Sequence, residues 1–325
     1  MVFGGAAPSR TFDPVRDLPS MAGKVAIVTG SSSGIGFATL QHLARMGAKV
    51  YMTVPDEPRT REALDRVERE GREPGMGEVI WHKLDLKDPR EAKASAEAFL
   101  ALEDRLDILI NNAALITDLG RPTMNPQGVQ DNMAINYLGP YVFTKTLLPL
   151  LERTAESGAD ARIVNVGSHG HADVNFHKFG SLKDWNHKFP ISFLPTLSRY
   201  KFSKLAVHLW SNDLSKTLQK KGSRVILLIS HPGAILSDGA VRSLKTLPLS
   251  PVFIWGMSKI MFPQTMGAYS TVFAACAPRD NGIIENGAYI FPPNVKGQQA
   301  KNALNEKSQK ELADATEKIL AEHGI

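Results

Sequence analysis

Residues 24–47 read KVAIVTGSSSGIGFATLQHLARMG, and the fold that we expect for the chain depends on this stretch. Residues 25–28 form a short uninterrupted apolar run, which is typical of a strand buried on both faces of a parallel sheet. Apolar residues then recur at helical spacing from Phe37 to Ala44, and Gly47 follows where a helix commonly ends. The pattern predicts a strand, a glycine-rich turn and a helix.

The turn contains Gly30, Gly34 and Gly36. Backbone N–H groups in such a turn can approach a pyrophosphate, and the helix N-terminus adds a partial positive charge. A side chain at Gly30 or Gly36 would fill space that the phosphates and the strand need. Glycine-rich turns often serve tight packing alone, so the triplet by itself is weak evidence. Its place at the first strand-to-helix switch favours a dinucleotide site.

Composition limits the class of protein. The chain has 325 residues, 43% of them hydrophobic, which is enough for one large α/β domain. Its single cysteine, Cys276, excludes an internal disulfide and suits a reducing compartment, so we expect an intracellular, cytoplasmic protein. No signal peptide or membrane-spanning run is apparent. The net charge of +5 is spread thinly, which argues against a nucleic-acid partner.

Further strands and helices alternate along the chain. Strands are expected at residues 25–28, 49–54, 79–84, 106–110, 162–166, 223–229 and 288–291. Helices are expected at residues 37–46, 89–103, 129–156, 200–218, 267–276 and 305–321. Residues 1–21 are rich in Gly and Pro and predict an extended arm that precedes a single domain over residues 22–325.

A serine, a tyrosine and a lysine stand where chemistry could occur. Ser168 follows the end of the strand at 162–166, and Tyr200 and Lys204 share one face of a predicted helix. Reduction of a carbonyl by hydride needs a proton donor, and oxidation of an alcohol needs a base. A lysine ammonium beside a phenol favours the phenolate. A Tyr-x-x-x-Lys pair is common by chance and gains its weight from the glycine-rich turn and Ser168.

The motifs TGSSSGIG at 29–36, NNAA at 111–114, YKFSKLA at 200–206 and HPG at 231–233 resemble those of the short-chain dehydrogenase/reductase family, over about residues 23–293. The resemblance implies a Rossmann-like doubly wound parallel sheet of about seven strands with helices on both faces. The long interval between Ser168 and Tyr200 looks like the retinol dehydrogenase-like branch, which includes the oxidoreductase domain of WW-domain oxidoreductases. Members of that branch reduce apolar aldehydes and ketones or oxidise the alcohols.

The resemblance implies catalytic roles for Asn136, Ser168, Tyr200 and Lys204, each at a position that matches a family motif. Tyr200 would be the general acid/base, Lys204 would stabilise its anion, and Ser168 would donate a hydrogen bond to the substrate oxygen. Asn136 would bend its helix and hold a water behind the lysine. An Asn in mid-helix is more often only solvated or capped, but the following Gly139-Pro140 favours the functional role.

The resemblance also implies NADP or NAD as the cofactor and no metal. An Asp at the end of the third strand would hold the adenine, and the Pro-Gly turn would bracket the nicotinamide. Ala114 replaces the glycine of the family motif and adds a methyl group beside the cofactor. The expected cofactor contacts are Gly30, Ser32, Ser33, Gly34, Ile35, Gly36, Asp85, Leu86, Asn112, Ala113, Ala114, Tyr200, Lys204, Pro232, Gly233, Ile235 and Ser237.

The end of the second strand gives a divided signal on the choice between NADP and NAD. Family members place an acid or a base at the positions of Val54–Pro55, and neither is present. Asp56 and Glu57 follow, but so do Arg59 and Arg61, which could reach a 2′-phosphate. We predict a modest preference for NADP.

Two long segments bear on the substrate. Residues 169–199 contain four histidines on a long loop without matched acidic or cysteine partners, so we expect no metal site there. The same segment has aromatic residues that could form an apolar substrate wall, namely Phe176, Phe179, Trp185, Phe189 and Phe193. Residues 247–266 are apolar and could be core, a membrane-surface anchor or a lid. We expect a substrate lid over about 237–266, where family members place their substrate loop.

The leading interpretation is an NAD(P)-dependent oxidoreductase that interconverts an apolar carbonyl compound and its alcohol by hydride transfer. The alternative is a catalytically silent dinucleotide-sensing protein, although such proteins usually lose the Tyr or the Lys. A sugar-nucleotide epimerase normally has another glycine spacing and a larger C-terminal domain. The helices at 129–156 and 200–218 could pair in a homodimer, as in family members, and a monomer also fits. Peripheral membrane contact stays open.

Overall fold

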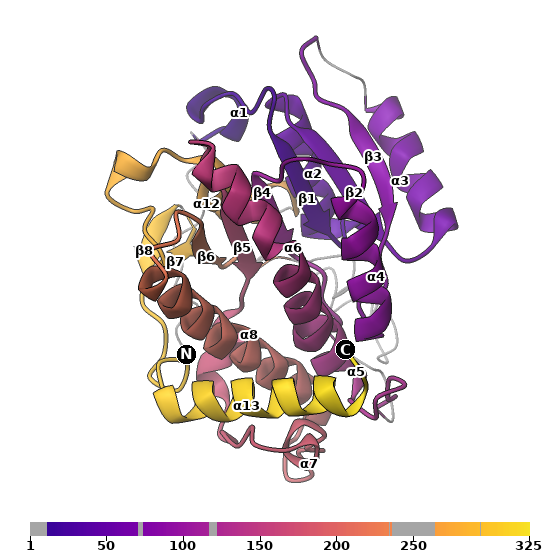
Figure 1. Ribbon diagram of the computed structural model, residues 1–325, viewed down its shortest axis with the longest axis vertical. Helices are drawn as coiled ribbons and strands as arrows, with labels where there is room; N and C mark the ends of the chain where they lie inside the picture. The colour runs from indigo at the N-terminus through magenta and orange to yellow at the C-terminus, as the bar shows by residue number, and fades with distance from the viewer. Residues whose placement is uncertain (1–11, 71–73, 117–121, 234, 236–263, 293) are drawn as a thin grey trace.

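The computed structural model describes residues 12–70, 74–116, 122–233, 235, 264–292 and 294–325. Eight strands form one sheet in the order β3-β2-β1-β4-β5-β6-β7-β8. The strands are β1 Val25–Thr29, β2 Lys49–Val54, β3 Val79–Lys83, β4 Ile108–Asn111, β5 Arg162–Val166, β6 Ile226–Ser230, β7 Tyr289–Phe291 and β8 Val295–Gly297. The first seven run parallel, and the order reverses between β1 and β4 (Figure 1).

Helices cover both faces of the sheet, as a doubly wound α/β fold requires. They are α1 Pro14–Asp17, α2 Gly34–Arg45, α3 Glu57–Arg69, α4 Pro89–Leu100, α5 Asp131–Met133, α6 Gly139–Glu156, α7 Leu182–Trp185, α8 Pro195–Lys220, α11 Gln264–Gly267, α12 Tyr269–Cys276 and α13 Glu306–Glu322. The π-helix η1 Ala134–Leu138 and the 3₁₀ helices η2 His169–Asp173 and η3 Arg279–Asn281 complete the described elements. The predicted fold class is confirmed, with one strand more than expected.

The additional strand is the antiparallel edge strand β8, which pairs with β7. Its residues VKG give no apolar run, and Val295 and Lys296 are exposed, so the sequence pattern did not indicate a strand. The strands at the centre behave as predicted. In β1, Ala26 and Val28 pack with α2 and α12, whereas Val25 and Ile27 pack with α4 and α6 on the opposite face.

The helix expected over residues 129–156 is broken into α5, η1 and α6. Pro140 lacks the N–H that would bond the Asn136 carbonyl in a regular helix, and the Gly139 N–H bonds the Ala134 carbonyl instead. Gly139 also packs so closely on the Leu86 carbonyl that any Cβ would overlap it. A bend at Asn136 was expected from the family resemblance, and the π turn is its structural form.

The described part of the N-terminal arm is more ordered than expected. Asp13 caps α1 and Pro14 starts it, a favourable beginning for a short helix. Leu18 and Met21 are buried, and the Phe12 ring meets Tyr269 with 5.5 Å between centroids. Residues 12–21 therefore pack against α2 and α12 rather than extending away.

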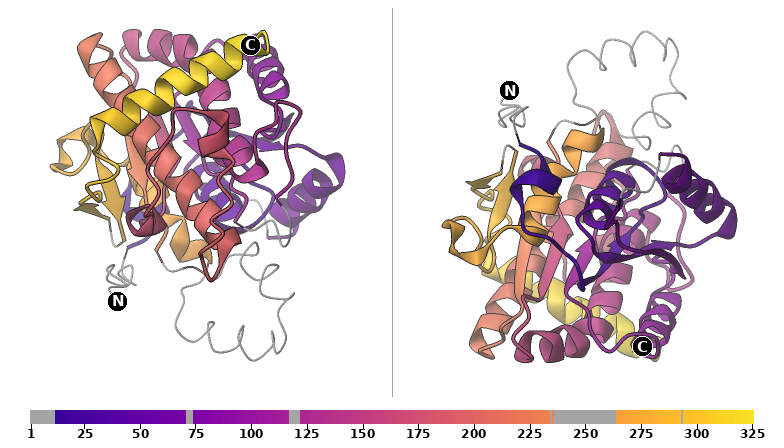
Figure 2. Two further views of the ribbon diagram at one scale, coloured as in Figure 1. Left: turned by 90° about the horizontal axis from the view of Figure 1, so that it is seen from below. Right: turned by 90° about the horizontal axis from the view of Figure 1, so that it is seen from above.

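The C-terminal helix α13 lies across α8 beside the start of α6 (Figures 1 and 2). Leu312, Ile319 and Leu320 pack in a third apolar cluster that includes Tyr137 and Trp210. Residues 237–263 of the expected lid lie outside the described residues. Among the described helices, none combines the length and apolar character that a membrane crossing needs.

Candidate functional site

A cavity of about 540 Å³ opens at the carboxyl ends of the strands, where the order of the sheet reverses. Its walls are residues that directly follow six strands, together with Arg59 of α3, Ile135 of η1 and the Tyr200–Lys204 pair of α8. The strand-end residues are 30 and 32–36 after β1, 53–55 at the end of β2, 84–86 after β3, 112–116 after β4, 166–167 at the end of β5 and Pro232 after β6. This is the place where open α/β sheets bind ligands.

The glycine-rich turn forms one wall. Gly30 has a φ of +65° and Gly34 a φ of +61°, values that favour glycine. A Cβ on Gly30 would lie 2.8 Å from the Ala113 Cα, and one on Gly36 would lie 2.6 Å from the Gly30 carbonyl oxygen. A side chain at either glycine would therefore overlap the protein itself, at the loop after β4 for Gly30 and within the turn for Gly36.

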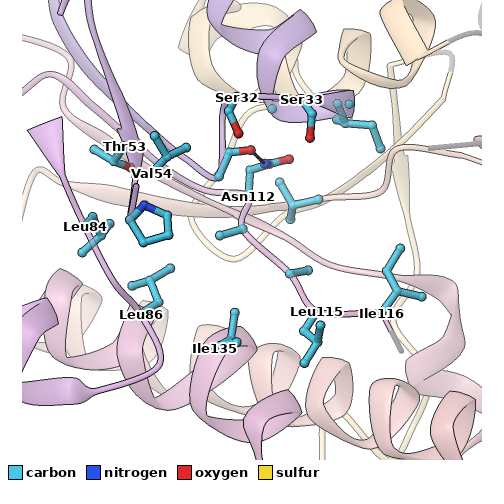
Figure 3. A pocket seen from close by; sticks show the side chains of 18 of the residues that line it. Ser32, Ser33, Thr53, Val54, Leu84, Leu86, Asn112, Leu115, Ile116 and Ile135 are labelled. Carbon is cyan, nitrogen blue, oxygen red and sulfur yellow. Dashed lines mark hydrogen bonds between the residues drawn. The ribbon is translucent and has the colours of Figure 1, made fainter. Parts of the chain in front are cut away.

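The helix α2 begins at this wall. Its N-cap, Ser33, makes no side-chain capping bond, and the first turn holds no acidic residue. Ser32 and Ser33 point toward the cavity in Figure 3. Ser31 turns inward instead, where its hydroxyl donates to the Val28 carbonyl at 2.7 Å. The positive end of the α2 dipole thus faces the cavity without an acidic neighbour in that turn.

Asn112 fastens the end of β4 to the end of β1. Its side-chain Nδ2 donates to the Thr29 carbonyl at 2.8 Å, and its backbone N–H donates to Thr29 Oγ1 at 2.9 Å. The Ala113 N–H donates to the same hydroxyl at 3.0 Å. These bonds hold the floor of the cavity at the strand reversal.

One end of the cavity is apolar and holds Val54, Leu84 and Leu86, and Ile135 lies next beyond Leu86 (Figure 3). Two charged residues border it. Asp85 accepts the Lys87 N–H at 2.8 Å through one carboxylate oxygen. Arg59 pairs with Asp56 at 3.2 Å on the surface, and Asp56 also caps α3.

Tyr200 lies one and a half turns into α8, deeper in the helix than expected. Burial raises the pKa of its phenol, and the hydrogen bond with the Ser168 side chain acts in the opposite direction. Ser168 caps η2 and accepts the Gly170 N–H at 3.2 Å through Oγ. The structure thus brings together the serine and the tyrosine that are 32 residues apart in the sequence.

Lys204 lies one turn after Tyr200 and is 2% exposed. Its Nζ donates to the Val166 carbonyl at 2.7 Å and lies 5.9 Å from the centroid of the Tyr200 ring. Desolvation lowers the pKa of its ammonium to about 8. The pKa of Tyr200 is raised in the structure without cofactor, because burial outweighs the hydrogen bond with Ser168.

Asn136 sits in η1 behind the cavity wall. Its Nδ2 donates to the Leu115 carbonyl at 3.0 Å and to Ser203 Oγ at 2.8 Å, and its Oδ1 accepts the Leu115 N–H at 2.6 Å. The Ser203 hydroxyl in turn donates to the Tyr200 carbonyl at 2.8 Å. Asn136 therefore links the loop after β4 to the helix that carries Tyr200, and both of its amide N–H donors are used.

Of the other expected cofactor contacts, two lie outside the cavity lining and one lies outside the described residues. Gly233 and Ile235 do not line the cavity, and Ile235 lies close to Gly267, on the side where Ile35 packs. Ser237 lies outside the described residues. Sequence reasoning missed several lining residues that belong to no motif, namely Thr53, Leu84, Leu115, Ile116, Ile135, Val166 and Gly167. All but Ile135 end or follow a strand, a position that could have indicated them.

The segment 169–199 does not supply the expected aromatic wall. Phe179 and Trp185 are fully buried against Phe202 of α8, and Phe193 is 97% exposed. None of the five aromatic residues lines the cavity. Within the described ranges, no cluster of His, Cys, Asp and Glu could hold a metal ion.

Comparison with known proteins identifies the family. Residues 24–178 match the model of the short chain dehydrogenase family. A short-chain dehydrogenase/reductase of Armillaria gallica is 39% identical over 306 residues, which cover 92% of this chain and 93% of that protein. Human retinol dehydrogenase 14 is 32% identical over 313 residues, which cover 91% of this chain and 86% of that protein.

A solved structure of an uncharacterised protein from Mycobacterium paratuberculosis is similar in fold, with a TM-score of 0.69. It is 24% identical in sequence and covers 94% of this chain and 96% of that one, a likeness that concerns the fold alone. The sequence relatives carry the assignment, because they match across most of both chains. The chain belongs to the short-chain dehydrogenase/reductase family of oxidoreductases, on its retinol dehydrogenase-like branch.

Proposed function

We propose that the protein is an NAD(P)-dependent oxidoreductase that interconverts an apolar aldehyde or ketone and its alcohol by hydride transfer. The observation that carries this proposal is the pairing of Tyr200 with the buried Lys204 in the wall of the cavity that the glycine-rich turn also lines. A proton donor and a dinucleotide cradle thus share one space. The cavity volume lies within the range of small-molecule and cofactor sites.

The residues around the cavity suit a nicotinamide dinucleotide. The N-terminus of α2, with Ser32 and Ser33, would hold the pyrophosphate. Asp85 and Leu86 would lie beside the adenine, and the Lys204 ammonium would bond the ribose next to the nicotinamide. When bound, the cofactor donates or accepts the hydride.

Side chains of the protein supply the proton and stabilise the charges that develop during its transfer. Burial keeps the Tyr200 phenol protonated at neutral pH, so it can donate to a carbonyl oxygen as negative charge develops there. Ser168 donates a hydrogen bond to the same oxygen, and Lys204 stabilises the phenolate that remains.

The lining supports an apolar substrate and a modest preference for NADP. Leu115, Ile116 and Ile135 add apolar surface to the cavity. Arg59 borders it next to Val54–Pro55, where the adenosine ribose would lie. Because the Arg59–Asp56 pair is exposed, its exchange for a phosphate would cost little.

Tyr200→Phe tests the proposal and separates an enzyme from a silent dinucleotide sensor. NADPH oxidation would be followed by absorbance with a panel of apolar aldehydes and ketones, and the Phe variant should lose about 10²- to 10⁴-fold in turnover. NADPH binding, measured by fluorescence, should stay near wild type because only a hydroxyl is removed. Full turnover in Tyr200→Phe would disprove the mechanism, and binding without turnover in the wild-type protein would favour the sensor.

A further inference from the structure

A stacked pair of histidines lies behind Ser168, outside the cavity lining. The ring centroids of His171, in η2, and His208, in α8, are 3.8 Å apart, and the ring planes differ by 21°. Both side chains are buried, and neither has a role in the chemistry proposed above. Their hydrogen bonds indicate what they do.

His171 is bonded at both ring nitrogens. Nδ1 lies 2.6 Å from the Ser168 carbonyl oxygen, which also accepts the His171 backbone N–H at 3.2 Å. Nε2 accepts the Ala300 N–H at 3.1 Å. Because a carbonyl only accepts and an amide N–H only donates, the proton belongs on Nδ1 and the ring is neutral. One imidazole therefore joins Ser168 to a segment near the C-terminus.

His208 supports this arrangement from the other side. Its Nδ1 bonds Gln299 Oε1 at 2.8 Å, and Gln299 exchanges two side-chain hydrogen bonds with Asn212, at 2.9 and 3.0 Å. Among the residues that the structure describes, the Nε2 atom has no hydrogen-bond partner, and it faces Gly167, where a Cβ would lie 2.5 Å from it. His208 thus packs its face on His171 and its edge on Gly167.

The environment keeps both rings neutral. Burial lowers the pKa of His171 and lowers the pKa of His208 further, and the neighbouring His171 lowers the pKa of His208 as well. A proton on His171 Nε2 would also face the Ala300 N–H, two donors with no acceptor between them. The two rings therefore act as a fixed structural support, and neither is suited to take up a proton.

We propose that His171 is a positioning residue for Ser168, held in place by His208 and by residues 299–302. Two donors from His171 fix the Ser168 carbonyl, and that fixes the direction in which the Ser168 hydroxyl points toward Tyr200. Asn302 Nδ2 donates to the His171 carbonyl at 2.7 Å, so the backbone of His171 is also held by the segment near the C-terminus. The inference rests on the proposed function, because it assigns His171 a part in the role of Ser168.

Two matched substitutions separate positioning from simple packing. In His171→Asn, the amide Nδ2 takes the place of Nδ1 and can still donate to the Ser168 carbonyl, while the bond to Ala300 is lost. In His171→Gln, the amide reaches the place of Nε2, so the bond to Ala300 can form and the bond to Ser168 is lost. We expect His171→Asn to keep near-wild-type turnover and His171→Gln to lose ~10- to 100-fold, because a small misplacement of a catalytic group has effects of that size.

The decisive measurement repeats His171→Gln in a Ser168→Ala background. If His171 acts only by positioning Ser168, His171→Gln should lower turnover little further in the Ser168→Ala background. Both substitutions then remove the same contribution, that of the Ser168 hydroxyl. NADPH affinity should stay unchanged in all variants, and melting temperatures report any folding defect separately. Comparable losses of turnover from His171→Gln in both backgrounds, or equal losses in His171→Asn and His171→Gln, would overturn the inference about His171 and leave the proposed function standing.

Ser168→Ala by itself reports on the proposed function. Its turnover should fall with little change in NADPH affinity, as expected for an interaction made in the transition state. Unchanged turnover in Ser168→Ala would overturn both the role of Ser168 and the inference that depends on it. Activity in the wild-type protein that depends on Tyr200 but not on Ser168 would leave the oxidoreductase proposal standing.

Discussion

Lys204 is a buried cation, and its titration should be visible in the reaction. Desolvation lowers its pKa to about 8, and only the ammonium can stabilise negative charge on the Tyr200 oxygen. Because the ammonium is lost as the pH rises through about 8, we expect turnover in the reducing direction to fall on the alkaline side with an apparent pKa near 8.

The pH–rate profile of Lys204→Arg is the comparison for this prediction. A guanidinium stays charged throughout the range, so the alkaline limb should move to higher pH even if the maximum turnover is lower. An alkaline limb at the same pH in both proteins would mean that another group titrates.

Arg59 and Arg61 make a matched pair for the choice of cofactor. Arg59 lines the cavity, whereas Arg61 pairs with Glu57 at 2.7 Å and does not line it. We expect Arg59→Ala to weaken NADPH binding by roughly tenfold, since a charge-assisted bond contributes ~1.5 kcal/mol or more, and to leave NADH binding unchanged. Fluorescence titrations measure both, with Arg61→Ala as the control. Equal effects on NADPH and NADH would count against the assignment.

At the scale of single residues, sequence motifs identified the polar members of the site and those apolar members that stand within motifs, such as Leu86 and Ala113. Ser168, Tyr200 and Lys204 stand in recognisable patterns, and the structure brings them together. Apolar lining residues such as Leu84 and Ile116 carry no motif. The bonding of His171 also escaped prediction, because its partners lie at residues 168 and 300 and no local pattern links them.

At the scale of elements, the strands were predictable because each is a buried apolar run. The ends of β2 and β5 agree with the expected residues, and those of the other strands differ by a few residues. The failures have local causes. A proline changes the hydrogen bonding of the helix after residue 130, and β8 depends on pairing with β7 rather than on its own pattern.

The glycine-rich turn gives a prediction for an element. In Gly36→Ala, the new Cβ would overlap Asn112 and lie 2.6 Å from the Gly30 carbonyl oxygen, so backbone must shift. We expect a loss of ~1–3 kcal/mol in the free energy of unfolding, the usual cost of overpacking, together with a loss of NADPH binding. Denaturant titration and fluorescence measure these effects.

Gly180→Ala is the control for that substitution, because its Cβ would meet nothing within 4 Å and its φ is not positive. Both variants add one methyl group, so a difference between them reports the close packing at Gly36. Unchanged stability and binding in Gly36→Ala would show that the turn can relax, contrary to its contacts in the structure.

At the scale of the whole molecule, α13 covers part of the surface through which we expected two chains to pair. The Tyr137 hydroxyl bonds Thr316 at 2.6 Å, and Lys145 bonds Glu317 at 2.7 Å. Local sequence predicted a charged terminal helix but not this docking site, which lies on residues far away in the chain. An amphipathic pattern shows which face a helix buries and not what covers it.

We therefore expect the chain to be a monomer, because α13 covers a surface that could otherwise bind a second copy of the chain. Ile319→Asn places a polar residue in the buried face of α13, whereas Lys318→Asn changes an exposed neighbour on the same turn. The Ile319 variant should lose ~2–4 kcal/mol in the free energy of unfolding and expose the surface beneath, so light scattering should show larger species. The Lys318 variant should behave as wild type, with a mass of 35.5 kDa. If wild-type protein already forms dimers at micromolar concentration and Ile319→Asn leaves them intact, pairing must use another surface.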